Sequence, residues 1–385
     1  MKKLLTLVIL ILFLPSNLIL KADDKDGKKE IHKFQMLYNV ENTSVKNQSN
    51  SGTCWSFSAT SFLESELIRL GFGNHDISEM YFVRMNYPRK AERYMRYHGN
   101  FNFGPGGQAH DVTNVVKDFG MVPEEVYHGI NYYGEDKHDH SELDAVLKAM
   151  LDATLKSKSP KTTNAWDEAV DAVLDVYLGK VPNEFEYNGK KYTPQSFAKA
   201  SGFNPDDYIE FTSYSNYPFN QKVMLEVPDN WSFDLYYNVE LNDLMKIMDN
   251  ALATGYSIEW DGDVGKDNFY RKKGYAVIPK NNEIDPDDVE EPEEEKIITQ
   301  EIRQEAFDNH DVTDDHLMHI VALAENQNGT KFYYTKNSWG TKTGGKEMKY
   351  DGYWYMSDSY VRLKTIAFMV HKDAVPKEIR ERLGF

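Results

Sequence analysis

The chain has 385 residues, of which 61 are acidic and 44 are basic, so its formal net charge is −17. Such an acidic surface repels phosphate backbones, and nucleic acid is therefore not expected as a partner. The 41% of hydrophobic residues allow a large core, but the single cysteine excludes an internal disulfide bond, so packing alone must hold that core together.

The first 22 residues have the pattern of an export signal. Lys2 and Lys3 precede an apolar stretch over residues 4–14, which matches the core of a signal peptide and is too short to span a membrane. Ala22 is a small residue suited to cleavage. We expect residues 1–22 to be a signal peptide, the protein to be exported to the periplasm or the extracellular space, and no stable membrane insertion after cleavage. An uncleaved anchor is the alternative.

From Cys54 onward the pattern becomes helical. Apolar residues recur on one helix face at Ala59, Phe62, Leu63, Leu67 and Leu70. A glycine-rich loop over residues 104–107 precedes a second predicted helix over 112–119. Two further helices are predicted over 143–155 and 166–178.

The C-terminal part changes from helical to strand-like periodicity. Residues 281–295 carry nine acidic side chains and two prolines, which predicts a solvated loop or an unstructured insert. Strands are then predicted over 319–324 and 331–335, with a turn at 326–329, and over 353–356. Helices followed by antiparallel strands predict an α+β fold.

Cys54 lies where a glycine-containing loop enters a helix. Unpaired N–H groups and the positive end of a helix dipole stabilise a thiolate, so we expect a lowered thiol pKa and a strong nucleophile. An oxyanion formed by its attack on an amide carbonyl needs hydrogen-bond donors, which the Cys54 backbone N–H and the Gln48 side-chain amide supply. The alternative for Cys54 is a small buried apolar residue.

A thiol nucleophile also needs a base and a group that orients this base. His319 begins a predicted strand, and Asn337 follows the next one. If these strands are antiparallel neighbours, the Asn337 oxygen accepts from one ring nitrogen of His319 and the other nitrogen faces sulfur. The alternatives are a buried core histidine and an Asn-Ser turn.

Four motifs in this order resemble those of papain-like cysteine peptidases. They are Gln-x5-Cys-Trp-x-Phe over residues 48–57, the pair Gly106-Gly107, the strand with His319, and Asn-Ser-Trp-Gly over residues 337–340. Residues 51–55, 106–108, 119–123, 263–266 and 317–319 are most similar to the bleomycin hydrolase and aminopeptidase C branch.

The resemblance implies a thiol aminopeptidase that works through an acyl-enzyme. Cys54 attacks the peptide carbonyl carbon, His319 carries the proton, Asn337 orients His319, and Gln48 is an oxyanion donor. No cofactor is implied.

The same resemblance implies the substrate-binding residues. Gly106 and Gly107 let a peptide substrate run close to the enzyme backbone, and Trp339 shields the Asn–His contact from water. No metal is implied.

The papain-like fold that the resemblance implies has a helical left half and an antiparallel β-barrel right half within one domain over residues 23–385. Cys54 and His319 are 319 − 54 = 265 residues apart, against ~130–150 in the simple papain layout. A long insertion over about residues 130–255 therefore separates them. Members of the branch also form hexamers, which makes a homo-oligomer an expectation here.

The aminopeptidase activity of the branch depends on a C-terminal arm that blocks the cleft. Residues 375–379 resemble the segment before this arm, but the sequence then ends at Phe385. The arm looks absent or shortened, and an endopeptidase or dipeptide-releasing activity is the alternative.

Three other functions stay open. An acyltransferase would use the same Cys54–His319 pair, and an inactive peptide-binding scaffold would use neither residue. A metal protein would use Asp314, Asp315, His316 and His319. This set is disfavoured because His316 and His319 would face opposite sides of a strand.

Overall fold

The computed structural model describes residues 30–131, 137–157, 163–265, 268–281, 289 and 291–385. The predicted signal peptide lies outside the described residues, as do residues 282–288 and 290 of the acidic loop. In the described part of the chain no helix is long and apolar enough to cross a membrane.

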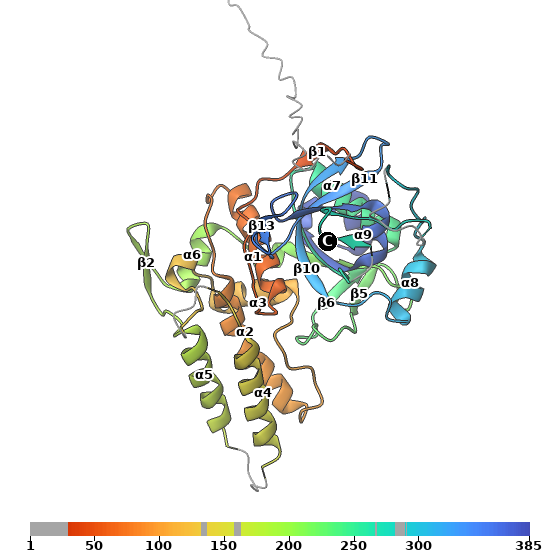
Figure 1. Ribbon diagram of the computed structural model, residues 1–385. Helices are drawn as coiled ribbons and strands as arrows, with labels where there is room; N and C mark the ends of the chain where they lie inside the picture. The colour runs from red at the N-terminus through yellow and green to blue at the C-terminus, as the bar shows by residue number, and fades with distance from the viewer. Residues whose placement is uncertain (1–29, 132–136, 158–162, 266–267, 282–288, 290) are drawn as a thin grey trace, which may run out of the picture.

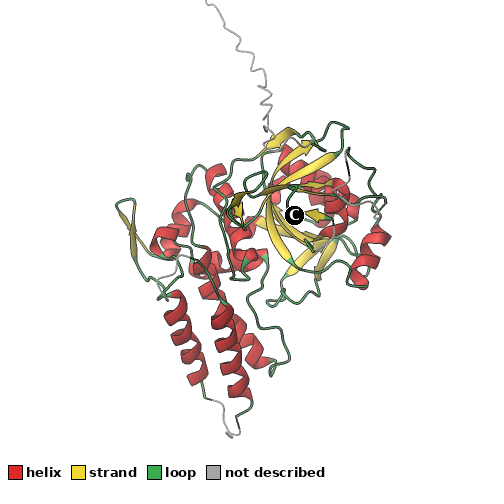
Figure 2. Ribbon diagram, viewed as in Figure 1, coloured by secondary structure: helices red, strands yellow, loops and turns green. Residues whose placement is uncertain are grey.

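Helices form one half of the molecule, and most of the strands form the other (Figure 2). The helical half contains α1 (Cys54–Arg69), α2 (Glu79–Arg96), α3 (Ala109–Phe119), α4 (Ser141–Leu155), α5 (Ala165–Leu178) and α6 (Pro194–Ser201). A small hairpin of β2 (Phe185–Tyr187) and β3 (Lys190–Tyr192) lies beside α6 (Figure 1). Helices α4 and α5 run side by side and project away from the rest of the molecule.

The predicted helix at Cys54 is confirmed. α1 buries Phe62, Leu63 and Leu67 completely in the core of the helical half, as its apolar face requires. The predicted helices over 112–119, 143–155 and 166–178 are confirmed as α3, α4 and α5.

A strongly curved, 11-stranded sheet forms the other half, with the order β5-β6-β4-β15-β7-β10-β11-β14-β9-β8 and β1 paired to β10. Its strands are β1 (Gln35–Asn39), β4 (Tyr208–Thr212), β5 (Gln221–Met224), β6 (Leu235–Asn238), β7 (Ile258–Gly262), β8 (Phe269–Tyr270), β9 (Tyr275–Ala276), β10 (His316–Glu325), β11 (Lys331–Lys336), β14 (Tyr353–Ser357) and β15 (Thr365–His371). The strands β12 (Lys342–Thr343) and β13 (Lys346–Glu347) form a separate hairpin.

The α+β class is confirmed, but the sheet of the right half is not a closed barrel. Among the described residues, the two end strands β5 and β8 do not pair with each other. Two neighbouring pairs, β4–β6 and β14–β9, are parallel rather than antiparallel.

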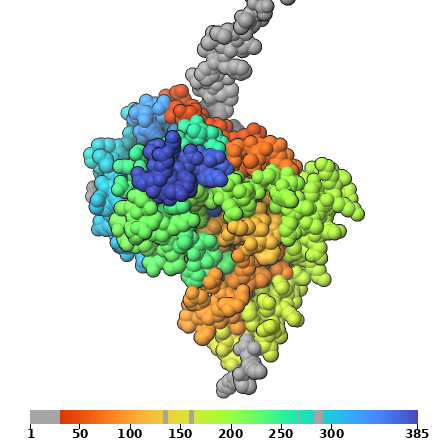
Figure 3. Space-filling view, turned by 180° about the vertical axis from the view of Figure 1, so that it is seen from behind, coloured from red at the N-terminus to blue at the C-terminus, as the bar shows by residue number. Residues whose placement is uncertain are grey.

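Four more helices accompany the sheet: α7 (Leu241–Ala253), α8 (Gln300–Asp308), α9 (Asp358–Lys364) and α10 (Lys377–Leu383). Short 3₁₀ turns occur at Glu124–Val126, Pro205–Asp207 and Lys372–Ala374. The C-terminal segment lies on the outer surface, seen from behind in Figure 3, where the Phe385 ring packs on Tyr237 at 5.2 Å. The two halves meet where α1 packs against β10.

Candidate active site

Cys54 is the first residue of α1 and follows a turn that requires glycine. Gly52 has a φ of +65°, and a Cβ atom there would lie 2.6 Å from Cγ of Pro105. The indole N–H of Trp55 donates to the Pro105 carbonyl oxygen at 2.8 Å. The glycine-rich loop is therefore held against the turn and fixes where the helix begins.

The Cys54 sulfur is half-buried against β10, where the Leu317 backbone donates a hydrogen bond to it. Burial raises the pKa of the thiol to about 12, the Leu317 bond partly opposes this rise, and the charges of Asp229, Asp261 and Asp314 add to it. The expectation of a lowered thiol pKa is wrong, because burial outweighs the hydrogen bond from the Leu317 backbone. A neighbouring base must therefore remove the thiol proton.

His316, directly before Leu317, is the histidine that Asn337 holds. Its Nε2 atom lies 2.9 Å from Oδ1 of Asn337, and the Ser338 backbone N–H donates to the same oxygen at 2.7 Å. Because this oxygen only accepts, Nε2 carries the ring proton and Nδ1 is the basic nitrogen. The Trp339 ring covers the imidazole, with ring centroids 4.8 Å apart.

The electrostatics keep both reacting groups neutral before reaction. Burial lowers the pKa of His316 to about 4, although its bond to Asn337 acts in the opposite direction. Neither the thiol of Cys54 nor this imidazole ionises readily alone.

His319 lies on the other face of β10, and its predicted contact with Asn337 is wrong. Its Nδ1 atom is 2.8 Å from Oγ of Ser61, and the Lys336 ammonium donates to the same hydroxyl at 2.7 Å. Burial, followed by the charge of Lys336, holds the pKa of His319 well below its ordinary value.

Strand alternation explains this correction. In the antiparallel ladder His319 pairs with Lys336, and directly paired residues share one face of the sheet. Asn337 follows Lys336 and so points to the opposite face, which is also the face of His316. Because the two histidines are three residues apart on one strand, only one of them can face the cysteine. The sequence alone does not show which one, because it does not reveal how this strand pairs with its neighbours.

The same alternation separates the residues of the metal-site hypothesis, since His316 and His319 point to opposite faces. Among the residues that the structure describes, no group of three or more His, Cys, Asp or Glu side chains is arranged to hold a metal ion.

Gln48 is held beside Asn337 by two hydrogen bonds to Ser338. Its backbone N–H donates to the Ser338 carbonyl oxygen at 2.8 Å, and the Ser338 hydroxyl donates to its Oε1 atom at 2.6 Å. Because Oε1 faces Ser338, the amide NH₂ of Gln48 points elsewhere and is available as a donor to an oxyanion.

Gly106 and Gly107 pack against the protein's own side chains. A Cβ atom on Gly106 would overlap the Asp229 carboxylate, and one on Gly107 would lie 2.7 Å from Oδ2 of Asp111. The Lys90 ammonium donates to the Gly106 carbonyl oxygen. Asp229 therefore fills the side of Gly106 on which a Cβ atom would stand, and the predicted contact of Gly106 and Gly107 with a substrate backbone stays a prediction.

Comparison with known proteins identifies the family. The model of the Peptidase C1-like family matches residues 88–384, which are most of the chain. The chain belongs to this family. The match includes His316 and Asn337, whereas Cys54 and Gln48 precede it.

Individual relatives agree with this assignment. Aminopeptidase G of Lactobacillus delbrueckii subsp. lactis is 25% identical over 378 residues, covering 88% of this chain and 83% of that protein. Aminopeptidase C of the same organism is 22% identical over 413 residues, covering 95% and 88%. The crystal structure of PepW from Lactobacillus rhamnosis superposes with a TM-score of 0.70 at 20% identity, covering 91% and 84%. The resemblance to papain-like peptidases of the aminopeptidase C branch is confirmed.

In this Peptidase C1-like protein, the charges of three carboxyl groups that the sequence interpretation did not place at the site, Asp229, Asp261 and Asp314, act on the thiol. Asp314 accepts from Nε2 of Gln108 at 3.0 Å and from the backbone of Asp229, and its carboxyl group meets that of Asp261. Burial raises the pKa of Asp314 to about 7 and that of Asp261 well above its ordinary value. Only the fold brings these three residues together, since Asp229, Asp261 and Asp314 are distant in sequence.

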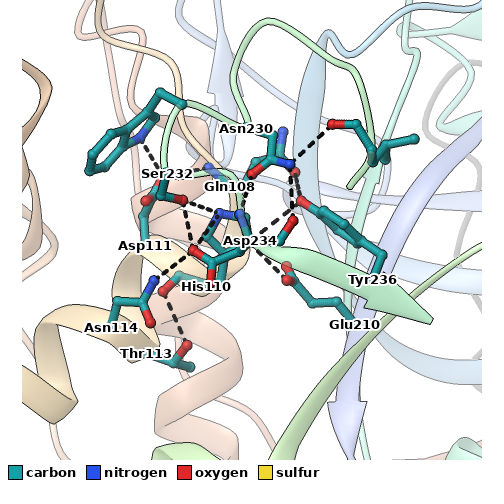
Figure 4. Close-up of polar contacts among 12 residues, drawn as sticks. Gln108, His110, Asp111, Thr113, Asn114, Glu210, Asn230, Ser232, Asp234 and Tyr236 are labelled. Atoms are coloured by element: carbon teal, nitrogen blue, oxygen red, sulfur yellow. Dashed lines mark hydrogen bonds and ion pairs between the residues drawn. The ribbon is translucent and has the colours of Figure 1, made fainter. Parts of the chain in front are cut away.

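The segment that carries Asp229 is tied to the start of α3 (Figure 4). Three hydrogen bonds join them: Nε1 of Trp231 to Oδ2 of Asp111 at 2.8 Å, Oγ of Ser232 with Nε2 of His110 at 2.9 Å, and Nδ2 of Asn114 to Oδ2 of Asp234 at 3.0 Å. Asp229 itself accepts from Nδ2 of Asn102 at 2.9 Å. These bonds fix the carboxylate of Asp229 in place beside Gly106.

Proposed function

We propose that the chain is a cysteine aminopeptidase with Cys54 as nucleophile and His316 as its base. The observation that carries this proposal is the hydrogen bond between His316 and Asn337, made directly beside Leu317, whose backbone bonds to the Cys54 sulfur. It supplies a nucleophile, a base of defined tautomer and a group that orients this base.

The reaction follows from these positions. Nδ1 of His316 takes the proton of Cys54, and the sulfur attacks the carbonyl carbon of the scissile bond. The carbonyl oxygen becomes an oxyanion that the Gln48 amide and the Cys54 backbone N–H stabilise. When the C–N bond breaks, His316 gives its proton to the departing amine. His316 then deprotonates a water molecule, which attacks the thioester and releases the acid and the thiol.

The aminopeptidase assignment rests on two supports. Relatives over most of the chain are aminopeptidases G and C. In addition, the Asp229 carboxylate lies beside Gly106, which the resemblance places in the substrate cleft, and we infer that it limits how far a substrate extends past its first residue. Endopeptidase and dipeptide-releasing activities are the competing outcomes of the test.

The test compares aminoacyl-aminomethylcoumarin substrates that have a free or an acetylated amino group. We expect the free substrate to be hydrolysed much faster, and iodoacetamide or Cys54→Ala to abolish this hydrolysis. Unchanged hydrolysis by Cys54→Ala would exclude the thiol mechanism. Preference for the acetylated substrate would exclude an aminopeptidase and favour an endopeptidase.

We also propose that the protein is exported and forms a homo-oligomer. Export is supported by the signal-like residues 1–22, and oligomerisation by the resemblance to the aminopeptidase C branch. Fractionation of native cells should find the protein outside the cytoplasm, and its N-terminal sequence should begin at residue 23. Light scattering distinguishes a 44.5 kDa monomer, less its signal peptide, from a hexamer.

A further inference from the structure

The carboxyl groups beside the nucleophile form an unusual buried site. Asp261 is 1% exposed, and the hydrogen-bond partner of its carboxyl group is a second carboxyl group, that of Asp314. The charges that act most strongly on Asp261 are those of two other carboxyl groups, Asp314 and Glu259, and not that of a cation. A buried pair of carboxyl groups without a counter-charge is costly to ionise, so this pair is suited to a cationic ligand.

The three carboxyl groups differ in exposure: Asp229 and Asp314 are partly buried, whereas Asp261 is fully buried. Asp261 pairs with Leu317 in the ladder of β7 and β10, and the Leu317 backbone bonds to the Cys54 sulfur, so this carboxyl group lies beside the position where a carbonyl carbon is attacked.

The chemistry of an aminopeptidase substrate places a cation at this position. Its α-ammonium group is only two bonds from the carbonyl carbon that sulfur attacks. We propose that Asp229, Asp314 and Asp261 bind the α-ammonium group of the substrate's first residue and so select peptides with a free N-terminus. This inference rests on the proposed aminopeptidase function and names the residues that determine its specificity.

The site is rigid enough to select by charge. The bonds shown in Figure 4 tie the segment of Asp229 to α3, and its backbone in turn holds Asp314. The charge of Lys90 acts on Asp229, but the Lys90 ammonium already donates hydrogen bonds to the carbonyl oxygens of Gly104 and Gly106. A charge-assisted bond from an ammonium group to a preorganised carboxylate is among the stronger polar contacts.

Binding without turnover tests the site independently of the proposed chemistry. In Cys54→Ala protein, calorimetry should show phenylalanine amide binding at least about 30-fold more tightly than N-acetylphenylalanine amide, because only the former carries the ammonium group. Adding Asp314→Asn or, in a second variant, Asp229→Asn should remove most of this preference. Equal binding of the two amides, or an unchanged preference in both folded variants, would overturn the proposal.

Kinetics then separate this inference from the proposed function. With Cys54 present, Asp314→Asn should lower kcat/KM for the free aminoacyl substrate by about 100-fold and leave the acetylated substrate unaffected or improved. Glu226→Gln, an exposed carboxylate bonded to Tyr217 in the same segment, is the matched control and should change neither value. Equal losses of kcat/KM on both substrates would overturn the inference. If the enzyme that retains Cys54 hydrolyses neither substrate, but the protein still binds the free amide more tightly, only the proposed function is overturned.

Discussion

His316 and His319 differ in what their ring nitrogens face, although both are buried on β10. Only His316 has a ring nitrogen held by Asn337, which leaves Nδ1 as the proposed base. We expect His316→Ala to lower kcat/KM by about 10²–10⁴-fold, the usual contribution of a positioned base. His319→Ala should retain turnover but lower the free energy of unfolding by about 1–3 kcal/mol, because Ser61 loses a buried partner. Hydrolysis rates and denaturant titrations check both, and a folded His319→Ala without activity would contradict the assignment.

Gln48 should act on the transition state rather than on substrate binding. Its amide NH₂ is positioned by the bond from Ser338 to Oε1, and an oxyanion is present only after attack. Gln48→Ala should therefore lower kcat by about 10²–10³-fold with little change in KM. The control variant Ser338→Ala keeps the Gln48 amide but removes the hydrogen bond that orients it, so kcat should fall less than in Gln48→Ala. A rise in KM at constant kcat would indicate a role in ground-state binding instead.

At the scale of elements, the turn before α1 controls where the nucleophile lies. Gly52→Ala places a Cβ atom 2.6 Å from Pro105 at a φ of +65°, so the glycine-rich loop must move. Gly71→Ala, after the same helix, has a φ of +78° and nothing within 4 Å. Both should lose about 1 kcal/mol from the backbone conformation alone, but only Gly52→Ala should also lose activity. Thermal unfolding and kcat/KM measure the two effects, and equal kcat/KM in both variants would show that the Pro105 contact does not position Cys54.

Local patterns predicted the elements better than their arrangement. The start of α1 at Cys54 was readable because apolar residues repeat at helical spacing, and β10 and β11 were readable from their apolar and aromatic runs around a turn. The pairing of His319 with Lys336 was not readable, because a one-residue shift of register exchanges the two faces of a strand. The contact between Asp229 and Gly106 was likewise hidden, since it depends on how a segment after β5 packs on α3.

At the scale of the whole molecule, the proposed active site lies where the two halves meet. α1 from the helical half supplies Cys54, whereas β10 and the segment after β11 supply His316 and Asn337. Each half has its own hydrophobic core, so the distance between sulfur and imidazole depends on the packing of α1 against β10. Substitutions where α1 packs against β10 should therefore lower activity while both halves remain folded.

Buried carboxyl groups should make the stability of the protein fall as pH rises from about 6 to 8. Burial raises the pKa of Glu64 to about 7 and those of Glu259 and Asp261 well above their ordinary values. Between the ordinary and the folded pKa the unfolded chain has lost protons that the folded chain keeps, so each group costs about 1.4 kcal/mol per pH unit. The melting temperature should rise as pH is lowered from 8 to about 6, below which buried histidines such as His140, whose pKa burial lowers to about 3, oppose the trend. Glu259→Gln should flatten this dependence, whereas the exposed control Glu226→Gln should not. A melting temperature that is highest at pH 8 or above would show that these carboxyl groups are ionised in the folded protein.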